Sequence, residues 1–135
     1  MANNQNFILT VLLSSAVIFL GCPPAELTSA RVYLNEKNYD KAEQFLLKTM
    51  EVAPENAEAP ALMGNEIYGN RQDWVKMNEM FEKALSINPL EKMADGLTVE
   101  QYINNNRYFS WTTAFNNAII EYNKIIHLTG EERDR

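Results

Sequence analysis

Residues 38–57 read NYDKAEQFLLKTMEVAPENA, and residues 73–92 read DWVKMNEMFEKALSINPLEK. Each stretch opens with a polar residue followed by an aromatic one, Tyr39 or Trp74, and each continues into a helical pattern that ends at a proline. The two prolines, Pro54 and Pro89, are 35 residues apart. Self-similarity at a fixed period is typical of proteins built from repeated helical units. The two stretches therefore predict an all-α chain with an internal repeat.

Both stretches also carry an apolar stripe at helical spacing, which predicts that one face of each helix is buried. The stripes consist of Ala42, Phe45, Leu46, Thr49 and Met50 in the first stretch, and of Val75, Met80, Phe81, Ala84 and Leu85 in the second. Small residues at Ala30, Ala42, Gly64 and Ala84 would let neighbouring helices approach closely. Because one helix pair is too small to bury its own apolar face, neighbouring pairs are expected to stack.

The pattern resembles the tetratricopeptide repeat, a helix-turn-helix unit with a period of 34 residues. The resemblance covers residues 25–90, with one inserted residue placed in the NRQD loop (70–73). Matching signature positions are Ala30, Tyr33, Ala42, Leu46 and Pro54, then Gly64, Ile67, Phe81, Ala84 and Pro89. The resemblance implies a short right-handed α-solenoid with two repeats over residues 26–90.

The remaining segment, 91–135, is less regular. Thr98 and Gln101 form a capping-box pattern, which predicts a short helix from Thr98 to about Asn104. We expect NNNR (104–107) to interrupt it, and a long helix to run from Phe109 to Leu128. Two interpretations stay open: the long helix begins a third repeat that is cut off, or the two pieces form a complete but irregular third repeat.

The first 21 residues contain no Asp, Glu, Lys or Arg, and Phe7 to Leu20 is an apolar run. As a helix this run would be roughly 21 Å long, short of a membrane core of about 30 Å. It fits the apolar region of a signal peptide over residues 1–21. Gly21 and Cys22 resemble a bacterial lipobox, which implies cleavage before Cys22, a lipid on its thiol and a tether over 22–25. An uncleaved apolar anchor, or a signal cut elsewhere, is the alternative.

The charge and the scarcity of reactive side chains exclude several functions. The net charge of −6 lies entirely after Gly21 and argues against nucleic acid as a partner. One cysteine and one histidine cannot supply a zinc site without several carboxylates, and we expect no metal or other cofactor. His127, near a predicted helix end, is expected to be structural. No catalytic set can be nominated, although the many carboxylates leave a glycoside-cleaving pair open as an alternative.

In the resembled family, ligands lie along the inner face of the first helix of each repeat. The matching positions here are Leu27, Arg31, Leu34 and Asn35, then Ala61, Asn65, Tyr68 and Gly69. Arg31 would bind an acidic group of a peptide, unless it only offsets Glu26 or Glu66. The expected function is a lipid-anchored scaffold that binds a protein or peptide at the bacterial cell envelope, on the outer membrane or the periplasmic face. The alternatives are the helical platform of a cell-wall enzyme, or a spacer in a longer repeat protein.

Overall fold

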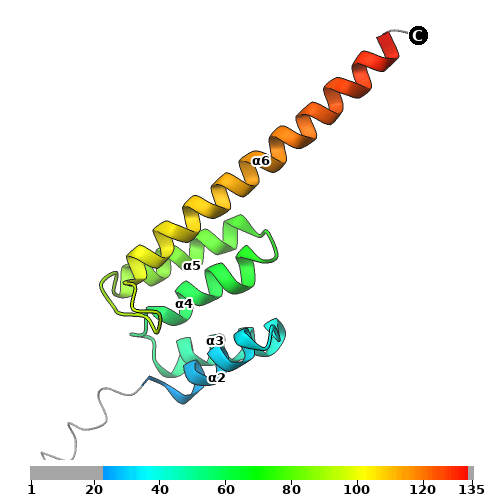
Figure 1. Cartoon of the computed structure of the whole chain (residues 1–135). Helices are drawn as coiled ribbons and strands as arrows, with labels where there is room; N and C mark the ends of the chain where they lie inside the picture. Colours follow the sequence, from blue (N-terminus) through cyan, green and yellow to red (C-terminus); the bar gives the residue numbers. More distant parts are fainter. Residues whose placement is uncertain (1–22, 134–135) are drawn as a thin grey trace, which may run out of the picture.

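The computed structural model describes residues 23–133, with side-chain detail for residues 23–126. The helices in chain order are α2 (Ala25–Asn35), α3 (Tyr39–Val52), α4 (Glu58–Leu62), the π-helical η2 (Met63–Gly69), α5 (Trp74–Ile87) and α6 (Val99–Arg133) (Figure 1). No strand forms within these described residues, so the prediction of an all-α chain is confirmed. The predicted signal segment 1–21 and Cys22 lie outside the described residues. Helix α2 begins at Ala25, which is the last residue of the predicted tether.

The turns before α3 and α5 have the same local backbone geometry, at an offset of 35 residues. Asn38 caps α3 by accepting from the Lys41 amide, and Asp73 caps α5 by accepting from the Lys76 amide. Each cap follows a residue with positive φ, Lys37 at 56° or Gln72 at 57°. The backbone hydrogen bonds match as well: the Asn38 amide donates to the Tyr33 carbonyl and the Asp73 amide donates to the Tyr68 carbonyl, both at 2.9 Å. The two turns therefore have the same backbone bonds and the same kind of cap.

The inserted residue does not lie in the NRQD loop as expected. The Glu36 amide donates to the Val32 carbonyl, and the Arg71 amide donates to the Ile67 carbonyl. Because these equivalent bonds are already offset by 35 residues, the extra residue lies before Ile67. That region is the π-helical segment η2, which follows α4 without a break. A single-turn π segment is how an α-helix accommodates one additional residue. The insertion therefore widens the helix and leaves the turn unchanged.

One apolar core joins the helix pairs to the start of α6. Its largest fully buried side chains include Leu27, Leu46, Met63, Phe81 and Ile103. Gly64 lies against Phe81 so closely that a Cβ atom there would meet the ring at 2.7 Å. The expectation that small residues let helices approach closely is thus confirmed at this position.

Helix α6 runs without interruption through residues 104–107, so the predicted break at NNNR is wrong. The capping box at its start is confirmed: the Thr98 amide donates to Gln101 Oε1 at 3.0 Å, and the Gln101 amide donates to Thr98 Oγ1 at 3.2 Å. Arg107 binds Asn78 and Glu82 of α5, which fixes the helix where the break was expected. Asparagine in a helix costs only about 0.7 kcal/mol relative to alanine, which such contacts offset.

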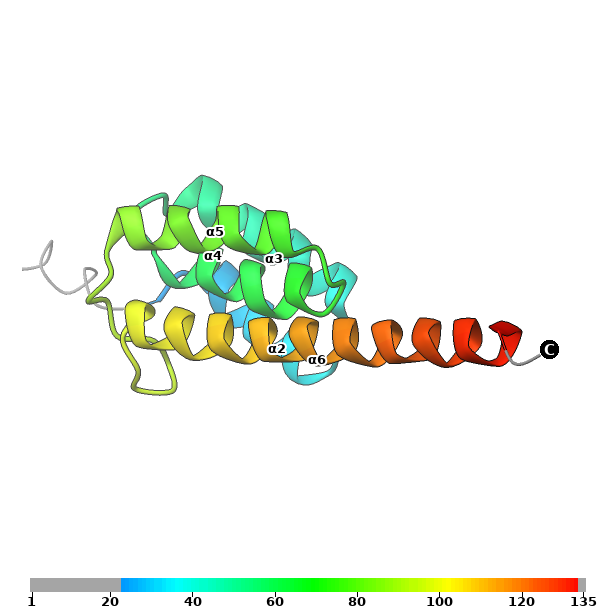
Figure 2. The same ribbon diagram turned by 90° about the horizontal axis from the view of Figure 1, so that it is seen from above.

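The two halves of α6 have different surroundings. Val99, Ile103 and Ser110 are buried against the other helices. Beyond them the helix extends past the rest of the molecule (Figures 1 and 2). Among the described residues, no helix is both long and apolar enough to cross a membrane.

Candidate functional site

A cleft of about 360 Å³ opens between α2, α4, η2 and the turn before α6. It is lined by Arg31, Leu34, Asn35, Glu58, Leu62, Glu66, Met93, Ala94, Asp95 and Tyr102. Three of these, Arg31, Leu34 and Asn35, are groove positions expected from the sequence. The cleft combines apolar side chains with several charged ones, a mixture that is common in ligand-binding clefts.

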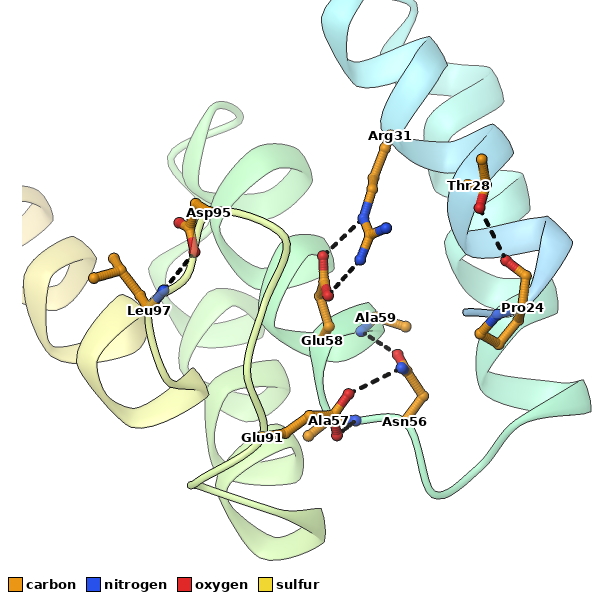
Figure 3. A network of polar contacts seen from close by, with 10 residues as sticks. All are labelled: Pro24, Thr28, Arg31, Asn56, Ala57, Glu58, Ala59, Glu91, Asp95 and Leu97. Atoms are coloured by element: carbon orange, nitrogen blue, oxygen red, sulfur yellow. Dashed lines mark hydrogen bonds and ion pairs between the residues drawn. The ribbon is translucent and has the colours of Figure 1, made fainter. Parts of the chain in front are cut away.

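Arg31 holds one wall of the cleft to the other through a bidentate ion pair with Glu58 (Figure 3). Its Nε donates to Glu58 Oε1 at 2.9 Å, and its Nη2 donates to Glu58 Oε2 at 2.6 Å. The Glu58 side chain is only 4% exposed, whereas that of Arg31 is 27% exposed. A carboxylate this buried requires a partner, because desolvation of an unpaired charge is costly. Arg31 is therefore a structural link between α2 and α4.

The start of α4, which carries Glu58, is itself fixed by a residue distant in sequence. Glu91 accepts from the Ala57 amide at 2.9 Å and from the Asn56 side-chain amide at 3.0 Å (Figure 3). Asn56 in turn accepts from the Ala59 amide at 2.9 Å. These contacts satisfy amides that the first turn of a helix leaves without partners. They position Glu58 opposite Arg31.

A second polar cluster joins η2 to α6 at the far side of the cleft. The Tyr102 hydroxyl donates to Glu66 Oε1 at 3.2 Å and accepts from the Asn65 amide at 3.0 Å. The same Asn65 amide donates to Glu66 Oε1 at 2.8 Å. Burial, followed by the nearby Glu66 carboxylate, raises the pKa of the Tyr102 hydroxyl above its ordinary value. The hydroxyl therefore stays protonated and remains a hydrogen-bond donor to Glu66.

The cleft has an excess of negative charge. Its lining contains three carboxylates, Glu58, Glu66 and Asp95, and one guanidinium, for a formal charge of −2. Because Glu58 is neutralised by Arg31, the excess resides on Glu66 and on Asp95, which is exposed in the turn. Such a surface attracts cationic groups and repels anionic ones.

The other groove positions expected from the sequence are dispersed. Leu27 and Ala61 are fully buried in the core and contact no ligand site. Asn65 and Gly69 line a separate cleft of about 320 Å³ beside α6. Tyr68 lines neither cleft, and the Lys76 ammonium lies 5.5 Å from the centre of its ring. The positions expected to line one groove are thus distributed over two clefts and the core.

Sequence reasoning missed the residues that complete the cleft from the opposite side, which are Glu58, Met93, Asp95 and Tyr102. Glu58 gave no clear signal, because an acidic residue in the first turn of a helix is common and is favoured by the helix dipole. Asp95 and Tyr102 gave no signal either, since the contact of their segment with η2 depends on the tertiary fold.

Comparison with protein-family models, with curated proteins and with solved structures finds no match for this chain. Within the part of the chain that the structure describes, no group of three or more His, Cys, Asp or Glu side chains could hold a metal ion.

Proposed function

We propose that the protein is a short helical solenoid of the tetratricopeptide type that binds a segment of another protein in the cleft between α2 and α6. The observation that carries this proposal is the cleft itself, which is lined by the first helix of each pair and by the start of α6. The matching turns and caps before α3 and α5 support a repeat architecture. Repeat proteins of this kind use the surface formed by successive helices for binding.

The preferred ligand carries a basic side chain. The guanidinium of Arg31 is already bound to Glu58, so the expectation of an acidic ligand group at Arg31 loses its basis. Glu66 and Asp95 line the same cleft and keep their negative charge, although one oxygen of each accepts a hydrogen bond within the chain. Leu34 and Leu62 supply an apolar wall. A peptide with a lysine or arginine next to an apolar residue matches this surface.

A test of the cleft must leave the Arg31–Glu58 pair intact. Replacing Arg31 by alanine would leave a buried carboxylate without a partner, at a cost of about 3 kcal/mol or more. Loss of binding in such a variant would then report instability. Ala94 is a better position, because it is exposed and lines the cleft in the turn before α6.

The experiment compares Ala94→Trp with Ala25→Trp, an exposed alanine outside the cleft. Tagged full-length chains are used to recover proteins from an envelope extract. We expect wild type and Ala25→Trp to recover the same partner, and Ala94→Trp to lose it because the indole fills the cleft. Added salt should weaken the recovery, since the attraction is between charges. Equal recovery by both variants would show that the cleft is not the binding surface.

We further propose that a lipid on Cys22 anchors the protein to the bacterial envelope. The support is the sequence: an uncharged apolar run, then Gly21 and Cys22, then Pro23 and Pro24. Because α2 begins at Ala25, the folded domain would sit close to the lipid. Several acyl chains are needed for firm anchoring, since one chain binds membranes only marginally.

Labelled fatty acid should be incorporated into the wild type and be absent from Cys22→Ala, which should accumulate as an uncleaved precursor. Mass spectrometry of the mature wild-type chain should find modified Cys22 as its first residue. A mature chain that begins at any other residue would disprove lipidation at this position.

A further inference from the structure

The outer face of α6 carries a row of apolar side chains that no described part of the chain covers. Tyr108, Trp111, Phe115, Ala118 and Tyr122 follow one another at alternating steps of three and four residues, and Ile119 lies beside them. We call these six residues the α6 seam. Steps of three and four are the spacing of the contact positions in a coiled coil.

The seam faces away from the rest of the molecule. Helix α6 packs on the other helices through Val99, Ile103 and Ser110. At 3.6 residues per turn, the seam lies on roughly the opposite side of the helix from these positions. Its four aromatic side chains are 51–73% exposed. Figure 2 shows that the later part of the helix also extends beyond the other helices.

Two of the four aromatic rings of the seam are already stacked on each other. Trp111 and Phe115 are stacked with ring centroids 5.4 Å apart and an angle of 14° between their planes. Little side-chain entropy would therefore be lost when a partner covers them, which favours association.

We propose that the α6 seam pairs with the α6 seam of a second copy of this chain. A buried aromatic side chain contributes about 150–250 Å², so four half-exposed aromatics and their neighbours on two copies would bury on the order of 1,000 Å². That area is at the lower limit for a biological interface, about 1,000 Å², and corresponds to a weak dimer. Two seams of the same spacing are also self-complementary, as a symmetric interface requires.

The charges along α6 fit a second copy better than a membrane surface. Residues 108–120 contain no Asp, Glu, Lys, Arg or His, so two seams can meet without repulsion between like charges. A helix that lies on an anionic membrane instead carries lysine and arginine beside its apolar face. The segment offers neither, and the chain as a whole has a charge of −6. The seam also lies outside the cleft of the proposed function, so the two proposals stand separately.

The first test co-expresses two differently tagged full-length copies and measures how much of one is recovered with the other. Phe115→Asp places a charge at the middle of the seam, whereas Asn117→Asp places the same charge two residues on, on the side away from the seam. We expect Phe115→Asp to lower co-recovery about tenfold or more, because a carboxylate buried in an apolar interface lacks a partner. Asn117→Asp should resemble the wild type. Equal loss in both variants, or no co-recovery of wild-type copies, would overturn the proposal.

The second test uses cysteines in the full-length chain under mild oxidation, with the parent chain and its Cys22 as the background. Phe115 is at the centre of the seam, so its counterpart is near it whether the two helices run parallel or antiparallel. We expect Phe115→Cys to give a disulfide-linked dimer and Asn117→Cys to stay at background. A Phe115→Cys chain that is shielded from thiol reagents without forming this dimer, or that links to a different polypeptide, would show that another occupant covers the seam.

Discussion

At the scale of single residues, the absence of a side chain at Gly64 decides how closely two helices pack. A Cβ atom there would lie 2.7 Å from two ring carbons of Phe81 and 3.0 Å from the Met77 carbonyl oxygen. Phe81 is fully buried and has no space to move. We expect Gly64→Ala to lower the free energy of unfolding by about 1–3 kcal/mol, as measured by urea denaturation.

Gly69→Ala is the matched control, because it lies in the same π-helical segment with its nearest neighbouring atom at 3.5 Å. That distance is an ordinary contact, and alanine is favoured over glycine in helices by about 1 kcal/mol. Gly69→Ala should therefore be neutral or slightly stabilising. If the two variants lost equal stability, the close approach at Gly64 would not be the cause.

At the scale of elements, Glu91 fixes where α4 begins although it lies in the chain after α5. Its carboxylate accepts from the Ala57 amide and the Asn56 side chain, and Ala57 is fully buried. Glu91→Ala would leave these donors without a partner, and we expect a loss of about 1–3 kcal/mol in the free energy of unfolding. Glu91→Gln should lose less, since its amide oxygen can still accept one bond.

The control for Glu91 is Glu55→Ala, an exposed glutamate in the turn before α4. Its replacement should change stability by less than about 0.5 kcal/mol. Thermal melts of the three variants under one condition provide the comparison. A Glu91→Ala variant as stable as Glu55→Ala would show that the carboxylate does not determine the start of α4.

At the scale of the whole molecule, Tyr102 makes the free energy of unfolding depend on pH in the alkaline range. Burial and then Glu66 raise its pKa above the ordinary value of 10.0, so the unfolded chain loses this proton at a lower pH than the folded chain. The stabilisation that comes from protonated Tyr102 is complete below about pH 10. Above about pH 10 the unfolded state binds fewer protons than the folded state, so rising pH destabilises the fold. We expect the free energy of unfolding to fall with pH by up to about 1.4 kcal/mol per unit from this group.

Tyr102→Phe removes the titrating group and isolates its effect from the other tyrosines. At neutral pH the variant should be less stable by about 1 kcal/mol, because the hydroxyl bonds with Asn65 and Glu66 are lost. Urea denaturation at about pH 9 and about pH 11 should show a smaller decrease for the variant than for the wild type. Parallel decreases would mean that the pKa of Tyr102 is not raised by the fold.

The sequence by itself determined what depends on local periodicity and local hydrogen bonds. The apolar stripes predicted the helices, and the similarity of the two stretches predicted that equivalent helices begin near Tyr39 and Trp74. Thr98 with Gln101 predicted the start of α6. The contribution of Gly64 to close packing was also visible. The helices and their caps involve residues within a few positions of one another, so the local pattern specifies them. Gly64 is the exception, because its neighbour Phe81 lies in another helix.

Only the tertiary structure decided the site and the course of α6. Arg31 meets Glu58 across 27 residues, and Asn65 meets Tyr102 across 37, through contacts that exist only when the helices are packed. The asparagines at 104–106 indicated a break locally, but Arg107 binds α5 and the helix continues. Likewise Leu27 was assigned to the groove and lies in the core. The physical reason is that helix packing fixes which side chains are buried, and burial then determines which charges must pair.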